Sequence, residues 1–220
     1  MAIIDIHGLR KSYGQHIILS DLDFQIDQGE FVSIVGKSGS GKSTFINIIG
    51  LLDPLFSGEY VIHGTDLSKC SRKKMTELRN QLFGFVFQMY NLIHSYTVKD
   101  NILLPVLYSK GKKVDEEYYR SLICKLKIDH LENQYAINLS GGEKQRVAIA
   151  RAAINHPSVI IADEPTGNLD TENTKNVLDI FRFLQNEQGV TIIMVTHDPK
   201  AAMSADKALR LQNGKLVQVE

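Results

Sequence analysis

The stretch Gly36-Lys37-Ser38-Gly39-Ser40-Gly41-Lys42-Ser43 follows directly on the apolar run 31–35 and precedes a segment with helical periodicity. Glycines at the spacing GxxxxGKS let successive backbone N–H groups turn toward a phosphate chain, which a Cβ atom would keep away. A flexible Gly/Ser linker is the alternative, but strand, loop and helix abut with nothing between them. The pattern therefore predicts a phosphate-binding loop.

Two side chains of this loop are predicted to act on a nucleotide. Lys42 would reach the β- and γ-phosphates, and the hydroxyl of Ser43 would take a ligand position on Mg²⁺. The helix that begins near Lys42 directs the positive end of its dipole at the same phosphates. We count Thr44, which follows Ser43, with the nucleotide-binding residues.

The composition bounds the class of protein. The 220 residues contain 25 Lys and Arg against 25 Asp and Glu, and 43% are hydrophobic. This length suits one large domain with a buried core. Equal numbers of charges leave no overall basic field, so we expect no nucleic-acid partner.

Cysteine usage and hydropathy indicate the compartment. Cys70 and Cys124 lie far apart and match no metal-binding spacing, as is typical of thiols in a reducing compartment. No run approaches the ~20 apolar residues that a membrane span needs, and the N-terminus lacks the features of a signal peptide. We expect a cytoplasmic chain whose work at a membrane would need spans from another protein.

Alternating strands and helices predict an α/β fold with a parallel-sheet core. Strands are expected at 4–11, 22–26, 31–35, 59–63, 83–87, 159–164 and 191–196. Helices are expected from Lys42 to the stop at Asp53-Pro54 and at 69–80, 98–108, 114–126, 143–154 and 171–185. The first two strands suggest an antiparallel subdomain, 95–155 an α-helical insertion with a Lys/Gly turn, and Asn213-Gly214 a closing hairpin. We predict a single domain over 1–220.

Polar groups follow three more predicted strands, where ligands of parallel sheets bind. Gln88 would sense the metal, and Asp163 would hold Mg²⁺ through water. Glu164 would then orient and polarise the attacking water. His197 would contact the γ-phosphate, or it is a strand-end histidine with a structural role.

A second glycine-rich helix entry stands at Ser140-Gly141-Gly142. It is similar to an anion cradle but carries no lysine. The alternative is an N-cap serine followed by two turn glycines. Because one phosphate-binding loop already accommodates one triphosphate, a second cradle makes most sense for a nucleotide held by another copy of the chain.

Taken together, the sequence resembles the nucleotide-binding subunits of ATP-binding cassette (ABC) transporters from end to end. The motifs are the Walker A loop 36–43, the Q-loop glutamine Gln88, the signature 139–143, Walker B 159–163 followed by Glu164, the D-loop 168–170 and the switch histidine His197. Tyr13 matches the aromatic residue that stacks on adenine in this family, although packing at a strand end is the alternative. Lys37 and Ala136-Ile137 depart from the usual pattern without removing a catalytic group.

The resemblance implies a P-loop NTPase (RecA-like) fold, ATP and Mg²⁺ as ligands, and an ATP-dependent head-to-tail dimer. It further implies an integral-membrane permease partner and a peripheral location on the cytoplasmic face of the membrane. Segments 85–93, 101–105 and 164–170 are similar to the branch for lipoprotein release and macrolide or peptide efflux. The alternative function is that of the cell-division member, which regulates a cell-wall hydrolase through a membrane partner.

Residues 89–94 are unusually apolar and aromatic for a loop. We expect them to form, with the helix 98–108, a groove that receives a cytoplasmic helix of the permease, with Tyr90 and Leu92 as anchors. The alternative is that they pack under the helical insertion as hinge core.

Overall fold

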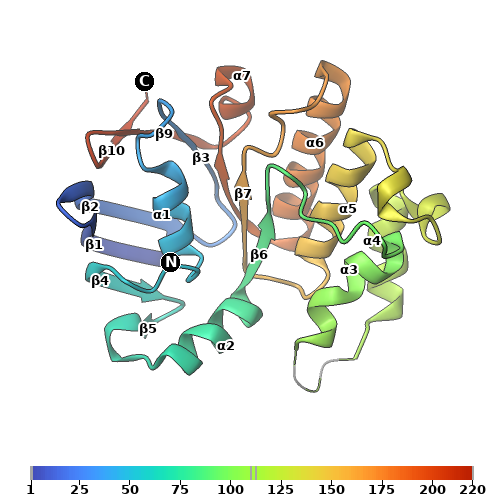
Figure 1. Cartoon of the computed structure of the whole chain (residues 1–220), viewed down its shortest axis with the longest axis horizontal. Coiled ribbons are helices and arrows are strands. Elements are labelled where there is room, and N and C mark those ends of the chain that lie inside the picture. Colours follow the sequence, from blue (N-terminus) through green and yellow to red (C-terminus); the bar gives the residue numbers. More distant parts are fainter. Residues whose placement is uncertain (1, 110, 112, 220) are drawn as a thin grey trace.

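The computed structural model describes residues 2–109, 111 and 113–219. The predicted Lys/Gly turn between two helices includes Lys110 and Lys112, which lie outside the described residues. Two sheets and the helices between and beside them form layers, with the antiparallel sheet at one end of the molecule and most helices at the other (Figure 1).

In the described part of the chain, six strands form the central sheet in the order β10-β9-β3-β8-β7-β6. They are β3 (Phe31–Val35), β6 (Phe83–Val86), β7 (Val159–Asp163), β8 (Thr191–Val195), β9 (Lys207–Gln212) and β10 (Lys215–Gln218). Neighbouring strands are parallel except β9 and β10, which are antiparallel. β3, β7 and β8 are apolar and buried along nearly their whole length, as expected for a parallel sheet covered on both faces.

One face of the central sheet is covered by α1 (Lys42–Ile49) and the antiparallel sheet (Figure 1). That sheet has the order β2-β1-β4-β5. Its strands are β1 (Ala2–Tyr13), β2 (His16–Asp27), β4 (Ser57–Ile62) and β5 (Thr65–Asp66). The Phe24 ring of β2 packs edge-on against Phe45 of α1, with centroids 5.4 Å apart. This core fixes the helix that follows the 36–43 loop.

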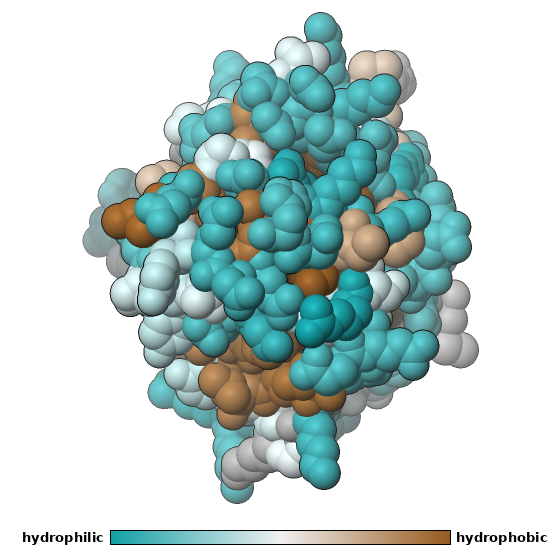
Figure 2. Space-filling view, turned by 90° about the vertical axis from the view of Figure 1, so that its right-hand side faces the viewer, coloured by the Kyte–Doolittle hydropathy of each residue, from teal (hydrophilic) through white to brown (hydrophobic). Residues whose placement is uncertain are grey.

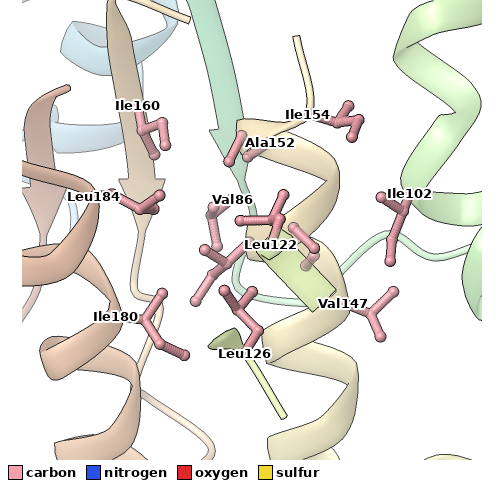
Figure 3. Packing of buried hydrophobic residues seen from close by; sticks show 14 of the residues in the cluster. Val86, Ile102, Leu122, Leu126, Val147, Ala152, Ile154, Ile160, Ile180 and Leu184 are labelled. Atoms are coloured by element: carbon pink, nitrogen blue, oxygen red, sulfur yellow. The ribbon is translucent and has the colours of Figure 1, made fainter. Parts of the chain in front are cut away.

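Helices cover the other face and share a second core with it. The main ones are α3 (Val98–Leu107), α4 (Glu116–Lys125), α5 (Gly141–Ala153) and α6 (Thr171–Gln188). In Figure 3, Val86 of β6 and Leu122 of α4 point toward one another, between Ile180 of α6 and Val147 of α5. The helical segment is therefore packed directly on the sheet. Figure 2 shows this side as mostly hydrophilic, with a hydrophobic area at its lower edge.

Several elements differ from the sequence prediction, and three of these differences have clear local physical reasons. β2 begins at His16 rather than near 22, because bulges let its first half, which lacks the apolar/polar alternation, pair with β1. α2 (Arg72–Leu82) begins three residues late, because the hydroxyl of Ser71 caps it by accepting from the Lys74 amide at 3.2 Å. The unpredicted helix α7 (Pro199–Ala202) is capped by Asp198, with Pro199 in its first turn.

Candidate active site

A cavity of about 460 Å³ opens where the carboxyl ends of β3, β6, β7 and β8 meet. Its lining residues are Ile18, Ser38, Gly39, Gly41, Lys42, Ser43, Thr44, Gln88, Asp163, Glu164 and His197. The predicted groups from all four strand ends thus lie around one space. Ile18 was not predicted to line it; the alternation of β2 gave a signal only from Leu22 on.

The 36–43 loop has a backbone that demands glycine. Gly39 and Gly41 have φ angles of 76° and 99°, which side chains strongly disfavour. A Cβ atom on Gly36 would lie 2.7 Å from the Ser40 hydroxyl and 2.8 Å from the Leu211 carbonyl. Gly41 also caps α1 without any side-chain hydrogen bond. The first backbone N–H groups of the helix therefore remain free to donate hydrogen bonds to an anion.

Lys42 lies across this loop. Its Nζ donates to the Gly36 carbonyl at 2.8 Å and to the Lys37 carbonyl at 3.1 Å. The Ser40 hydroxyl is buried and has no hydrogen-bond partner among the described residues. A positive charge, free helix amides and an unpaired hydroxyl together fit a phosphate group.

The carboxylate pair faces this positive loop across the cavity. Burial raises the pKa of Asp163, the charge of Glu164 raises it further, and Lys42 opposes both effects. Glu164 has a φ of 48°, in the left-handed region, and its amide donates to the Val195 carbonyl at 2.9 Å. Two like charges at one strand end favour a cation between them and a phosphate chain.

His197 is bound to Glu164. The Oε2 atom of Glu164 lies 2.8 Å from Nδ1 of His197 and accepts from the His197 amide at 3.2 Å. The histidine ring itself is exposed to the cavity side, while the carboxylate is mostly buried. This contact fixes the direction of both side chains.

The residues present also fit a hard divalent cation. Ser43, Gln88 and Asp163 all line the cavity and offer oxygen atoms, which Mg²⁺ prefers. Within the described ranges, no group of three or more His, Cys, Asp or Glu residues is placed to hold a metal. A magnesium ion here would therefore complete its shell with phosphate oxygens and water.

The signature residues lie outside this cavity. Ser140 caps α5 in a capping box: its hydroxyl accepts from the Glu143 amide, and the Glu143 carboxylate accepts from the Ser140 amide at 2.7 Å. A Cβ atom on Gly142 would lie 2.3 Å from the Asn173 amide oxygen, so this glycine permits close packing of α5 on α6. The local capping role is present, and the anion-binding role of Ser140, Gly141 and Gly142 stays a prediction.

Tyr13 is likewise not among the residues that line the cavity. It stands at the end of β1 with 53% of its surface exposed, and its hydroxyl donates to Asp53 at 3.1 Å. The Nζ atom of Lys11 lies 4.8 Å from its ring centroid. One ring face is thus supported by a cation, and stacking of an adenine on Tyr13 stays a prediction.

The loop after Gln88 does not form the groove that the sequence suggested. Leu92 is only 9% exposed and belongs to the helical core, and Tyr90 packs against the same core. The burial of Leu92 and the packing of Tyr90 favour the alternative that these two residues pack under the helices, and their role as anchors for a permease helix stays a prediction. A groove of about 480 Å³ lies instead among α2, β6, α3 and α5, and its lining includes Pro105 and Tyr108.

A profile of the ABC transporter family matches residues 19–167, which include the 36–43 loop, Gln88, the signature and the carboxylate pair. The chain belongs to the ABC transporter family. It is an ABC ATPase domain, as the resemblance in its motifs implied.

Its relatives include exporters and a lipoprotein-releasing system. The lipoprotein-releasing system ATP-binding protein LolD of Porphyromonas gingivalis is 41% identical over 215 residues, which are 97% of this chain and 98% of that protein. The bacitracin export ATP-binding protein BceA of Halalkalibacterium halodurans is 38% identical over 98% of this chain and 87% of its own. The macrolide export ATP-binding/permease protein MacB of Mannheimia succiniciproducens is 44% identical over 99% of this chain. The chain spans about a third, 34%, of that longer protein.

Solved structures confirm the fold. The dimeric ABC transporter cassette MJ0796 is 37% identical and superposes with a TM-score of 0.86 over 98% of this chain and 97% of its own. A dimeric post-hydrolysis state of MJ0796 bound to ADP and Pi is 36% identical, with a TM-score of 0.87 over 99% and 97% of the two chains. The predicted P-loop NTPase architecture is therefore correct. None of the described helices has the length and apolar character of a membrane span.

Proposed function

We propose that the chain is the ATP-hydrolysing subunit of an exporter or extractor, that it dimerises head to tail on ATP, and that it drives a separate membrane permease. The observation that carries this proposal is the division of the site. The phosphate loop, Gln88, the carboxylates and His197 share one cavity, whereas Ser140, Gly141 and Gly142 lie outside it.

Nucleotide binding falls to the 36–43 loop and the start of α1. The free amides at Gly41 and beyond donate to the phosphate oxygens, and Lys42 exchanges its two carbonyl partners for the β- and γ-phosphates. The backbone amides of Lys37 in the loop and Thr44 in the first turn of α1 would contact the same phosphates. Tyr13 takes the adenine on its open face, because Lys11 already supports the other.

The site fits Mg²⁺ with Ser43, Gln88 and Asp163 as the protein groups toward it. Bound there, the ion would neutralise charge on the phosphates. Asp163 has to be ionised for this role. Its pKa is raised by burial and by Glu164, and Lys42 counteracts that rise. The lysine thus serves the cation site as well as the phosphates.

Hydrolysis rests on Glu164 and His197. Glu164 is the carboxylate free to take a proton from the attacking water, since Asp163 is directed to the metal. His197 holds the Glu164 carboxylate at 2.8 Å through Nδ1, which leaves its Nε2 atom for the γ-phosphate. One contact therefore aligns the base with Nε2 of His197, which donates to the γ-phosphate when the ring is protonated on both nitrogens.

Dimerisation follows from the free end of α5. Its first turn offers the amides of Gly141 and Gly142 at the positive end of a 13-residue helix, away from the cavity of its own chain. A second copy turned head to tail would place them on the γ-phosphate of the first. The solved structures of MJ0796 are dimers, which supports dimerisation of this chain.

The permease is proposed to bind at the groove among α2, β6, α3 and α5. The groove contains the start of β6, whereas the cavity lies at the carboxyl end of that strand, so the two are on opposite edges of the sheet (Figure 1). At the rim, Leu107 and Tyr108 are 77% and 73% exposed. LolD, BceA and MacB favour an amphiphilic peptide, antibiotic or lipoprotein as cargo. The chain would then sit peripherally on the cytoplasmic face of the membrane.

A disulfide-trapping experiment tests the dimer and the nucleotide site together. In a variant without Cys70 and Cys124, cysteines at Ser38 and Ser140 should crosslink between chains when Mg-ATP is added. Addition of Lys42→Ala to this variant should abolish both the crosslink and ATP hydrolysis, because it removes the charge that holds the phosphates.

A matched control pairs the cysteine at Ser38 with one at Lys73 on α2, at the opposite edge of the molecule (Figure 1). This pair should give no ATP-dependent product. A crosslink that forms only within one chain, or equally without ATP, would contradict the head-to-tail dimer.

A further inference from the structure

The loop that follows Gln88 has an unusual backbone. Tyr90 and Asn91 are consecutive, and both lie in the left-handed region, with φ angles of 61° and 48°. A bulky residue such as tyrosine rarely adopts this conformation, and it persists only where the surroundings hold it. Turn hydrogen bonds from the Tyr90 amide to Phe87 at 2.9 Å and from the Asn91 amide to Met89 at 2.6 Å tighten the loop.

Arg151 holds both carbonyls of this turn. Its Nη1 atom donates to Asn91 at 2.5 Å and its Nη2 atom to Tyr90 at 2.6 Å. The planar fork of arginine suits two acceptors side by side, which the left-handed pair presents. In the described part of the chain Arg151 forms no ion pair, and burial lowers the pKa of its guanidinium. In the described part of the chain, the two loop carbonyls are the hydrogen-bond acceptors of this guanidinium.

The far end of the loop is also attached to the helices. Asn101 of α3 is fully buried; its Oδ1 accepts from the Ile93 amide at 2.8 Å, and its Nδ2 donates to the Ile93 carbonyl at 3.0 Å. The Tyr90 hydroxyl lies 3.3 Å from the position of a Cβ atom on Gly141, at the signature end of α5. The loop is thus fixed to α3 and α5, while Gln88 faces the cavity of the sheet.

Arg151 also lines the groove among α2, β6, α3 and α5. We propose that Arg151 is a positioning residue that holds the turn after Gln88 against α5 and so keeps Gln88 in the nucleotide cavity. This inference rests on the proposed function only for the chemistry at Gln88.

A double-mutant cycle on the purified full chain tests the link. Arg151→Gln and Gln88→Ala should each lower kcat by about 10-fold, with little change in KM for ATP, which lies within the up to about 100-fold that a displacement of about 1 Å at an active site can cost. The double variant should have a kcat about 10-fold below that of the wild type, as each single variant has. Independent effects would give about 100-fold, but here both substitutions act through the placement of Gln88. Arg151→Lys, which keeps the charge and a donor, should restore part of the rate.

Arg79 supplies the matched control. It lines the same groove, and its Nη1 atom also donates to a backbone carbonyl of a left-handed residue, Leu51, at 3.1 Å. Within the described residues, Arg79 forms no hydrogen bond with the loop after Gln88. Arg79→Gln combined with Gln88→Ala should therefore give the product of the two separate effects on kcat.

Hydrogen exchange gives a second readout that does not depend on turnover. In Arg151→Gln, amides of 89–94 should exchange faster, while those of β7 and α1 keep their wild-type rates. Multiplicative effects of Arg151→Gln and Gln88→Ala, or unchanged exchange in the loop, would overturn the proposal.

If Arg151→Gln does not fold, the same double-mutant cycle is carried out with Arg151→Lys and Gln88→Ala. Effects on kcat that multiply in that cycle would also overturn the proposal. If the wild-type chain hydrolyses no ATP, the proposed function fails, and loop exchange still decides whether Arg151 holds the turn.

Discussion

Replacement of Glu164 by Gln separates catalysis from structure, because the two side chains have the same shape. In the structure, Oε2 of Glu164 accepts from the His197 amide at 3.2 Å and lies 2.8 Å from Nδ1. Glutamine keeps an oxygen for one of these contacts and loses the charge. Charge-assisted hydrogen bonds are about twice as strong as neutral ones, so we expect a loss of about 1 kcal/mol in unfolding free energy. For a chain of this size, that lowers Tm by about 2–4 °C.

The effect on turnover should be far larger. An amide takes no proton from water, and a positioned general base contributes about 100- to 10,000-fold to a rate. We therefore expect kcat to fall by at least about 100-fold, which corresponds to about 2.7 kcal/mol. ATP should bind as well as before or better, because Lys42 and the loop remain and one of two neighbouring negative charges is gone. The charge of Glu164 contributes to the raised pKa of Asp163, so its removal also favours ionised Asp163.

Phosphate release, binding of a fluorescent ATP analogue and thermal unfolding measure the three quantities in one preparation. Glu59→Gln, at an exposed position of β4, is the control and should leave all three unchanged. A kcat for Glu164→Gln within about threefold of the wild type would refute the assigned role. A fall in Tm beyond about 8 °C would assign the lost rate to the fold instead.

Two further predictions concern the fold. Lys11 is 6% exposed and bonded to Leu55 at 2.5 Å and Asp53 at 2.7 Å, so Lys11→Met should lower the urea unfolding free energy by about 3 kcal/mol. Burial raises the pKa of Asp53, but hydrogen bonds from Lys11 and the Leu55 amide outweigh it; the net pKa is lowered. The contribution of Asp53 to the unfolding free energy is thus complete above its unfolded pKa of ~3.9 and is lost as pH falls through the folded pKa. The difference in unfolding free energy between wild type and Lys11→Met should shrink in that pH range. A difference that does not depend on pH would contradict this. A Cβ atom on Gly84 would lie 2.2 Å from the Ala152 carbonyl, so Gly84→Ala should destabilise by ~1–3 kcal/mol, and an unchanged urea midpoint would argue against close contact of β6 and α5.

The parallel sheet and the residues around the cavity were predictable because one physical cause controls both. Buried parallel strands must be apolar along their length, so 31–35, 159–163 and 191–195 stand out as runs of Val and Ile. Polar residues at the end of each run, or one or two positions after it, lie at the carboxyl edge of the sheet, where a ligand can reach them. Asp163 and His197 therefore line one cavity with the glycine-rich loop, as predicted. Their chemical roles stay predictions.

The loop after Gln88 was not predictable in the same way. Apolar loop residues indicate contact with something, and nothing in the local sequence distinguishes a partner protein from the chain's own helices. The burial of Leu92 depends on the packing of helices up to about 60 residues further along the chain. The start of β2 at His16 has a similar cause, since its first half, which does not alternate, is held by pairing with β1 and not by its own pattern.

Arg151 shows why such contacts carry function that a motif does not reveal. It stands 60 residues after Asn91 in sequence, and by pattern it is one more polar position near the end of an amphipathic helix. Only the fold brings its guanidinium onto two adjacent carbonyls whose residues are left-handed. A strained turn needs an outside partner, and here that partner lies on the helix that begins at the signature. The loop that follows Gln88 and the helix that follows Ser140 are therefore expected to move together. A shift of α5 should then change the position of Gln88 in the cavity.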